Sequence, residues 1–225
     1  MDWKKLNVEI VIPDKIKKLL FLVVGTWIFT AVASEILDYL SVGAYRVGKM
    51  IAPLVTAIPA LVVFVKEKKR LRDLFCRGVV KQLLCSMAML FVLLVIIAFL
   101  NHGIGWSVET SLFDKYNWYK IYSFVYYVLV IGFTEEFIYR VVVQDCIDEC
   151  IKKYKFLVPF LSAMVFGIAH YWVGGCGQVM MTFVLGLIWG YSKYYIKNVT
   201  YLAVSISHGL YDFGILVIPL LVSYL

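Results

Sequence analysis

The sequence predicts an all-α membrane protein, a polytopic transmembrane helix bundle of about seven to eight spans. Hydrophobic residues make up 62% of the 225-residue chain, and charged residues make up only 16%. The mean hydropathy of +0.84 is far above that of soluble domains, which need a polar surface. No linker, low-complexity tract or tandem repeat divides the chain. We therefore expect one membrane domain over residues 1–225, with a motif-bearing core at about 118–220.

Each expected helix corresponds to an apolar run of about the twenty residues that cross a bilayer. The runs cover residues 19–37, 47–65, 83–100, 121–142, 156–173, 179–195 and 202–220. Pro53 and Pro59 lie in the second run and predict a kinked or split helix, because proline donates no backbone hydrogen bond. A split would raise the count to about eight spans. Pro13 is expected to break any helix in the amphipathic residues 1–16.

The formal charge of +7 is distributed as in a membrane protein. Lysine and arginine gather before the first run, at residues 66–81, and near residues 152–155 and 193–197. Basic boundaries of this kind are typical of cytoplasmic loops and attract anionic lipid headgroups. We therefore expect membrane lipid, and not nucleic acid, as a partner. We also expect a cytoplasmic N-terminus and an outward-facing loop at residues 101–117.

The five cysteines show no strong metal-binding or redox pattern. No Cys-x-x-Cys pair is present, and Cys146 and Cys150 are four residues apart without a histidine nearby. Because free cysteine commonly packs as a small apolar residue, we expect the cysteines to be structural or incidental.

The segment EEFIYR at residues 135–140 directly follows the uncharged residues 121–134. A charge at the bilayer centre costs roughly 2.5–3.5 kcal/mol, so such groups are usually functional. Glu136 and Arg140 have the i,i+4 spacing of an ion pair, which leaves Glu135 as the freer carboxylate. On a helix the two glutamates point about 100° apart, so we expect only one to face a small site. The alternative is a solvated helix end, since acidic residues follow at 145–149.

Two of the three histidines also lie in apolar runs. His170 is near the end of one run, and His208 shares a helix face with Asp212 four residues later. Each could be an ordinary hydrogen-bonding contact between helices. Because three separate helices supply such groups, we expect His170, His208 and Glu135 to meet in one polar site. His102 falls in the expected outer loop and is interpreted as incidental.

The ordered set of motifs resembles the CAAX-processing and bacteriocin-processing intramembrane endopeptidases, also called the Abi family. The matching pieces are E-E-x-x-x-R at 135–140, F-x-x-x-H at 166–170 with Gly174 beyond it, Phe183 with Gly186 and Gly190, and H-x-x-x-D at 208–212. Order and spacing agree over residues 133–213, whereas the first 115 residues match only as apolar spans. Gly186 and Gly190 also form a small-xxx-small face, which permits close helix packing.

The resemblance implies hydrolysis of a peptide bond within the membrane. It implies that Glu135 and His170 activate water and that His208 and Asp212 stabilise the oxyanion. The implied substrate is a hydrophobic, lipidated or membrane-associated peptide. The chemistry is physically reasonable, because an imidazole donor aimed at a developing oxyanion lowers the barrier by a few kcal/mol in a dry cavity.

Glu136 and Arg140 are implied to orient the site, and Asp212 departs from the family pattern. Many relatives carry asparagine at this position, and an amide can donate a hydrogen bond to an oxyanion. An ionised aspartate has no proton to donate. Asp212 is therefore expected to be protonated, to orient His208, or to ligate a metal.

The four side chains Glu135, His170, His208 and Asp212 are also of the types that bind zinc. The His-Glu-x-x-His motif of zinc proteases is absent, however. We expect water activation without a metal and without a cofactor, with zinc as the alternative.

Two other functions are consistent with the sequence. A non-catalytic membrane protein could use the same scaffold for immunity or partner binding. A small transporter is the third interpretation, because intramembrane Glu, His and Asp sets also relay protons. No inverted-repeat pattern of hydropathy supports it. The short chain suits an integral protein of a bacterial plasma membrane.

Overall fold

The computed structural model describes residues 13–69, 74–75, 78–104 and 117–223, and this part of the chain forms helices and no strand. In chain order the helices are α1 (Asp14–Asp38), α2 (Val42–Thr56), α3 (Ile58–Lys66), α4 (Val79–Ile104), α6 (Asn117–Phe124), η3 (Val125–Ile131), α7 (Gly132–Glu136), η4 (Phe137–Val143), α8 (Gln144–Cys150), α9 (Leu157–Ala169), α10 (Tyr171–Tyr195) and α11 (Tyr201–Ser223). Within the described residues, 5 helical segments are long and apolar enough to cross a membrane, and shorter apolar helices cover Leu157–Ala169 and Tyr201–Val217. The protein is a helical integral membrane bundle, as predicted.

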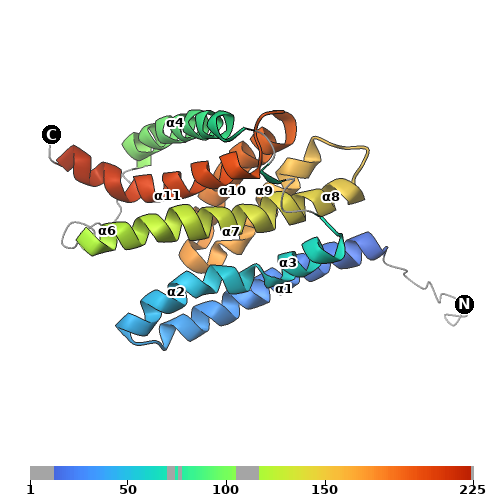
Figure 1. Ribbon diagram of the computed structural model, residues 1–225, viewed down its shortest axis with the longest axis horizontal. Helices are drawn as coiled ribbons and strands as arrows, with labels where there is room; N and C mark the ends of the chain where they lie inside the picture. Colours follow the sequence, from blue (N-terminus) through green and yellow to red (C-terminus); the bar gives the residue numbers. More distant parts are fainter. Residues whose placement is uncertain (1–12, 70–73, 76–77, 105–116, 224–225) are drawn as a thin grey trace, which may run out of the picture.

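A long helical rod runs through the middle of the molecule (Figure 1). It consists of α6, η3, α7, η4 and α8 joined end to end. Helices α1, α2 and α3 lie along one side of the rod, and α4 and α11 lie along the other (Figure 1). The η segments are π-helical turns, and both flank the short helix α7 that carries the two glutamates.

The second apolar run is split, as its prolines predicted. Helix α2 contains Pro53 and ends at Thr56, and Pro59 lies in the first turn of α3. Proline is tolerated in a first turn because its missing N–H would have no helical partner there. The two short helices together form an apolar segment from Ala44 to Lys66.

The fourth run is longer than predicted. We expected a helix over residues 121–142, but the apolar segment Trp118–Cys150 continues for 33 residues. The extra turns carry Asp145 and Glu149, whose carboxylates pair with lysines of other parts of the chain. These ion pairs let the helix continue beyond the uncharged run.

The predicted runs 156–173 and 179–195 form an antiparallel pair around a tight reversal. Gly175 has φ +64°, a left-handed conformation that glycine adopts without steric cost. Close approaches link Gly167 to Phe183 and Gly186 to Ala163 across the pair. The first helix already ends at Ala169, so His170 lies between α9 and α10 and not within one continuous helix.

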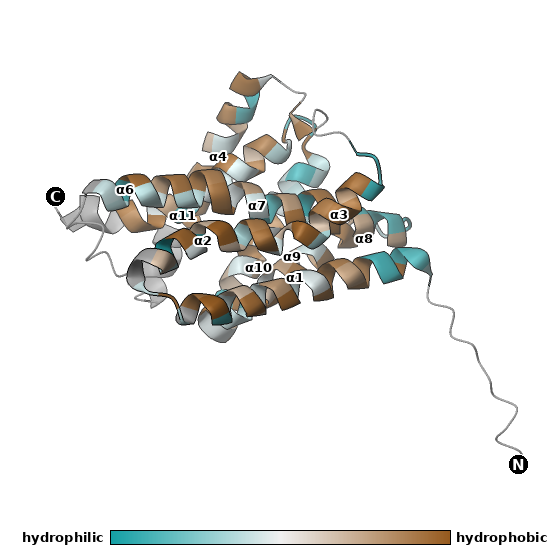
Figure 2. Cartoon of the chain, turned by 60° about the horizontal axis from the view of Figure 1, so that its bottom comes forward, coloured by the Kyte–Doolittle hydropathy of each residue, from teal (hydrophilic) through white to brown (hydrophobic). Residues whose placement is uncertain are grey.

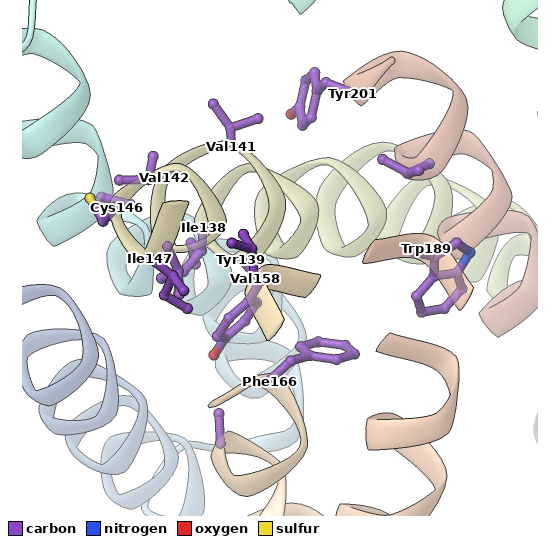
Figure 3. Close-up of a cluster of buried hydrophobic side chains, with 14 of the residues drawn as sticks. Ile138, Tyr139, Val141, Val142, Cys146, Ile147, Val158, Phe166, Trp189 and Tyr201 are labelled. Atoms are coloured by element: carbon purple, nitrogen blue, oxygen red, sulfur yellow. The ribbon is translucent and has the colours of Figure 1, made fainter. Parts of the chain in front are cut away.

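Apolar side chains of two kinds stabilise this arrangement. Those facing outward, such as Phe21, Ile28 and Val32 on α1, are exposed as expected for contact with lipid, and the outer helices are mostly hydrophobic (Figure 2). Those facing inward gather around η4 and α8 (Figure 3). The inward set includes Ile138, Val142, Cys146, Ile147, Val158, Phe166 and Trp189.

A set of charged side chains joins the helices at one end of the bundle. Lys18 pairs with Glu67 and, at 2.7 Å, with Glu149. Lys69 lies 3.1 Å from Glu67 and 2.8 Å from Asp145. We call Lys18, Glu67, Lys69, Asp145 and Glu149 the end network. It connects α1, the residues after α3 and the rod, and it contains lysines that the sequence placed at a cytoplasmic boundary.

Candidate active site

Glu135 and Glu136 lie on α7 in the middle of the long rod. Seven-residue π-helical segments precede and follow them, η3 at Val125–Ile131 and η4 at Phe137–Val143. π-Helical turns are rare and occur frequently at functional sites. They were not predicted from the sequence, because the residues involved have no distinctive composition.

His170 reaches Glu135 from the junction of α9 and α10. Its Nδ1 is 2.9 Å from the carbonyl oxygen of Phe166, which can only accept a hydrogen bond, so Nδ1 carries a proton. Its Nε2 then faces the site, 3.5 Å from Oε2 of Glu135. The ring of Phe166 also contacts the imidazole edge-on, with centroids 4.7 Å apart. Backbone and ring contacts together fix the orientation of His170.

His208 reaches both glutamates from α11. Its Nδ1 is 2.9 Å from Oε1 of Glu136, and its Nε2 is 3.9 Å from Oε2 of Glu135. Of the two glutamates only Glu135 lines the small cavity shared with His170, His208 and Asp212, as their separation of about 100° on the helix predicted. Glu136 meets the same imidazole from behind, because the two ring nitrogens of His208 lie on opposite sides of the ring. Asp212 completes the group, with Oδ2 3.4 Å from Nε2 of His208.

Two glycines bring α11 close enough to the rod for these contacts. A Cβ atom on Gly132 would lie 2.4 Å from the carbonyl oxygen of Ser205 and 2.8 Å from the amide nitrogen of Gly209. A Cβ atom on Gly209 would lie 2.5 Å from the backbone of Tyr127 and Val128. Such distances are far below van der Waals contact. Only glycine permits this crossing, and His208 is carried next to α7 because of it.

A buried polar network supports the site from behind. Arg140 Nε is 3.1 Å from Oε2 of Glu136, which confirms the predicted ion pair, and neither side chain has exposed surface. Arg140 Nη1 donates to Oγ of Ser162 at 3.0 Å, and Ser162 donates to the carbonyl oxygen of Tyr139 at 2.8 Å. Glu136 thus bridges Arg140 and His208. Buried charges are stable only when paired and hydrogen-bonded in this way.

Close packing around Arg140 also confirms the predicted small-residue face. A Cβ atom on Gly186 would lie 3.0 Å from the ring of Phe166 and 3.1 Å from Nη2 of Arg140. A Cβ atom on Gly190 would lie 3.4 Å from Pro159, which is an ordinary contact. The absence of a side chain at Gly186 therefore leaves room for the guanidinium group.

The structure adds residues that the sequence did not indicate. The ring of Trp189 stacks on His208, with centroids 4.2 Å apart and planes at 22°. Gln178 and Tyr211 line the same small cavity of about 80 Å³ as Glu135 and Asp212. Trp189 lies within the small-residue motif, between Gly186 and Gly190, but nothing in one sequence marks it as a partner of His208.

The site is partly accessible. The side chains of Glu135 and His170 are 20% and 16% exposed, whereas that of His208 is 4% exposed. The Oε2 atom of Glu135 is buried and makes no hydrogen bond to the described residues. A carboxylate oxygen in this position can accept a hydrogen bond from a water molecule or a substrate group.

Among the described residues, no group of three or more His, Cys, Asp and Glu side chains is arranged to hold a metal ion. Nε2 of His208 faces Asp212 at 3.4 Å and Glu135 at 3.9 Å, and its Nδ1 faces Glu136. The side chains face one another as in a hydrogen-bonded cluster.

Fold and site together define a class of protein: a polytopic helical membrane protein with a carboxylate and imidazole site between its helices. The family model described as "Type II CAAX prenyl endopeptidase Rce1-like" matches residues 117–214. These residues include every predicted site residue, and the match confirms the resemblance for this part of the chain. No curated protein and no solved structure matches the chain. The matched family is one of proteases, which supports an intramembrane protease of the CAAX type.

Proposed function

We propose that the protein is an endopeptidase that hydrolyses a peptide bond in a hydrophobic, lipidated or membrane-associated peptide. One observation carries the proposal. The carboxylate of Glu135 lies within 3.9 Å of the Nε2 atoms of both His170 and His208, and one of its oxygens is buried without a hydrogen bond to the described residues. A water molecule held there would face a base and two imidazoles.

Glu135 acts as the general base in this mechanism. His170 donates through Nδ1 to Phe166, so Nε2 of the neutral ring can accept a hydrogen bond from the water and orient it. Glu135 takes the second proton of this water as the water oxygen attacks the carbonyl carbon of the peptide. It then returns the proton to the leaving amine when the carbon–nitrogen bond breaks. General-base catalysis of this kind typically contributes about 10²–10⁴-fold.

His208 stabilises the oxyanion that forms during attack. Because its Nδ1 donates to Glu136, the ring has to carry a second proton on Nε2 in order to donate to the oxyanion. Arg140 holds Glu136 in place, and Trp189 covers one face of the ring. Of the roles considered for Asp212, orientation of His208 agrees best with the 3.4 Å separation of their polar atoms.

The proposed location is a bacterial plasma membrane, with the N-terminus in the cytoplasm. The basic residues at the first boundary and at residues 66–81 support this orientation. Within the end network Lys18 and Lys69 join these two segments to the rod. Membrane lipid and a hydrophobic or lipidated peptide are the proposed partners. Processing of bacteriocins or immunity to them remains a prediction from the sequence.

The function is tested with purified protein in detergent and a panel of hydrophobic and lipidated peptides. We expect cleavage by the wild type and a loss of about 10²–10⁴-fold in kcat/KM for Glu135→Gln, which keeps the shape but removes the base. Glu149→Gln is the matched control, because Glu149 lies on the same rod, in the end network. Cleavage that survives Glu135→Gln would contradict the mechanism. If Glu135→Gln cleaves no peptide but cells that carry it keep the immunity or partner binding of the wild type, the non-catalytic interpretation is favoured.

A further inference from the structure

Tyr211 lies in the wall of the small cavity of the candidate active site. It belongs to α11, three residues after His208, and lines the cavity of about 80 Å³ together with Glu135 and His170. The residue is only 2% exposed, and its hydroxyl oxygen is buried without a hydrogen bond to any described residue. Buried tyrosine hydroxyls usually have a hydrogen-bond partner. The wall of the cavity therefore contains a hydroxyl group that no acceptor of the described structure engages.

Aromatic packing fixes the position of Tyr211 relative to His208. The ring of Trp189 packs edge-to-face with that of Tyr211, with centroids 6.0 Å apart and planes at 77°. The same indole stacks on the His208 imidazole at 4.2 Å, and its Nε1 donates to Oγ of Ser207 at 3.2 Å. Residues three apart on a helix point to the same side. One side of α11 therefore presents the imidazole and the phenol to the cavity in a fixed relation.

Two other tyrosines of the bundle show how a structural hydroxyl is held. The hydroxyl of Tyr201, also on α11, donates to the carbonyl oxygen of Phe133 on α7 at 2.8 Å. That of Tyr122 on α6 donates to the carbonyl oxygen of Arg46 on α2 at 3.0 Å. Each of these bonds joins two helices through a backbone acceptor. Tyr211 makes no such bond to the part of the chain that the structure describes. Packing accounts for its ring but not for its hydroxyl.

The proposed mechanism creates an acceptor in this cavity only during the reaction. When water attacks the peptide bond, the carbonyl oxygen gains negative charge, and Nε2 of His208 donates to it. Ionised Asp212 has no proton to donate, and Thr182 of the same lining donates to the carbonyl oxygen of Gln178 at 2.7 Å. Donors already positioned where charge develops stabilise the transition state more than the ground state. A hydroxyl that is fixed in place and engaged by no other group meets this requirement.

We propose that the hydroxyl of Tyr211 donates a second hydrogen bond to the oxyanion, beside the one from Nε2 of His208. The inference rests on the proposed function and adds a catalytic residue to it. The phenol keeps its proton, because it only donates a hydrogen bond while Glu135 transfers the proton of the water. The partner of the buried hydroxyl is then the substrate oxygen, which becomes a strong acceptor when the carbonyl carbon is attacked.

The first test is Tyr211→Phe, which removes the hydroxyl and keeps the ring against Trp189. We expect kcat to fall on the order of 10²-fold, as when one oxyanion donor is removed, with KM changed by less than about twofold. The melting temperature should be unchanged or higher, because the variant loses a buried hydroxyl that has no partner. Tyr201→Phe is the matched control on the same helix. It removes a hydroxyl that has a partner, so the melting temperature should fall by roughly 2–4 °C while kcat changes by less than about threefold.

Binding of two uncleavable peptides separates this inference from the proposed function. Both have the sequence of the hydrophobic peptide that binds most tightly in the panel. In the phosphinate analogue a tetrahedral, anionic group that resembles the oxyanion replaces the scissile amide, whereas the ethylene analogue has no oxygen at that position. We expect Tyr211→Phe to weaken phosphinate binding on the order of tenfold to a hundredfold and to leave ethylene binding unchanged.

The outcomes distinguish the two proposals. If the wild type cleaves no peptide but binds the phosphinate through the Tyr211 hydroxyl, the proposed function fails and the donor assignment stands. Phosphinate binding that does not depend on Tyr211 overturns the donor assignment, whether or not peptides are cleaved. A higher KM at unchanged kcat would show that the hydroxyl binds the ground state, and it too would overturn the inference. So would a melting temperature that falls as in Tyr201→Phe, because the hydroxyl would then be structural.

Discussion

Charged side chains gather in two regions of this molecule, and the regions differ in burial. In the site, Glu136 and Arg140 have no exposed side-chain surface, whereas Lys18 and Glu67 of the end network keep 24% and 18%. Loss of one partner in the first region leaves a charge without water or counterion. In the second region water can replace the lost partner. The buried charges therefore form the site, whereas the partly exposed charges of the end network join the ends of helices.

The largest effect is expected from Arg140→Met, which removes the cation and keeps much of the side-chain length. Glu136 would remain buried without its ion pair, at a cost of about 3–5 kcal/mol. Unfolding in detergent measures this loss, and cleavage should fall as well because Glu136 no longer holds His208. Lys69→Met in the end network is the control and should cost about 1 kcal/mol or less. Equal losses in the two variants would remove the distinction between the regions.

An intermediate effect is expected where α11 crosses the rod. In Gly209→Ala the new methyl group would lie 2.5 Å from the backbone of Tyr127 and Val128, so the helices have to separate. Overpacking of this kind typically costs about 1–3 kcal/mol, and the shift of His208 should reduce cleavage. Gly214→Ala on the same helix meets its nearest atom at 3.9 Å and should be neutral or slightly stabilising. If Gly209→Ala behaves like Gly214→Ala, the crossing does not position the site.

The smallest effect is expected from Glu67→Gln in the end network. Burial opposes ionisation of Glu67, but Lys18 and Lys69 outweigh it and lower the pKa of its carboxyl group below the usual value. A lowered pKa stabilises the folded protein above the pKa of the unfolded chain, about 4.3, and this contribution is lost as the pH falls through the folded value. We expect the variant to lose about 0.2–1 kcal/mol at pH 7.

The pH dependence of the melting temperature tests whether the ionised Glu67 carboxylate stabilises the folded protein. The difference in melting temperature between wild type and Glu67→Gln should shrink as the pH is lowered below about 5, because the wild-type carboxylate becomes protonated. Cleavage activity at pH 7 should not change. A difference that grows in acid, or a loss of activity comparable with that of Arg140→Met, would show that the end network and the site are coupled.

Several features of the site were predictable because they depend on local sequence. The Glu136–Arg140 pair follows from i,i+4 spacing, and the split at Pro53 and Pro59 follows from proline chemistry. The stacking of Trp189 on His208 was not predictable. It depends on which helix faces meet, and one sequence contains no measurement of distance between helices.

The amino-acid sequence by itself determined that this is a helical membrane protein with acid and imidazole groups in three apolar runs, because hydropathy, spacing and proline act over a few residues. Only the tertiary structure decided that Glu135 and Glu136 meet opposite sides of one histidine, and that His170 sits at a helix junction beside the reversal at Gly175. The reason is geometric. The contact of Gly132 with Gly209 joins segments far apart in the chain, and such approaches depend on the packing of the whole bundle.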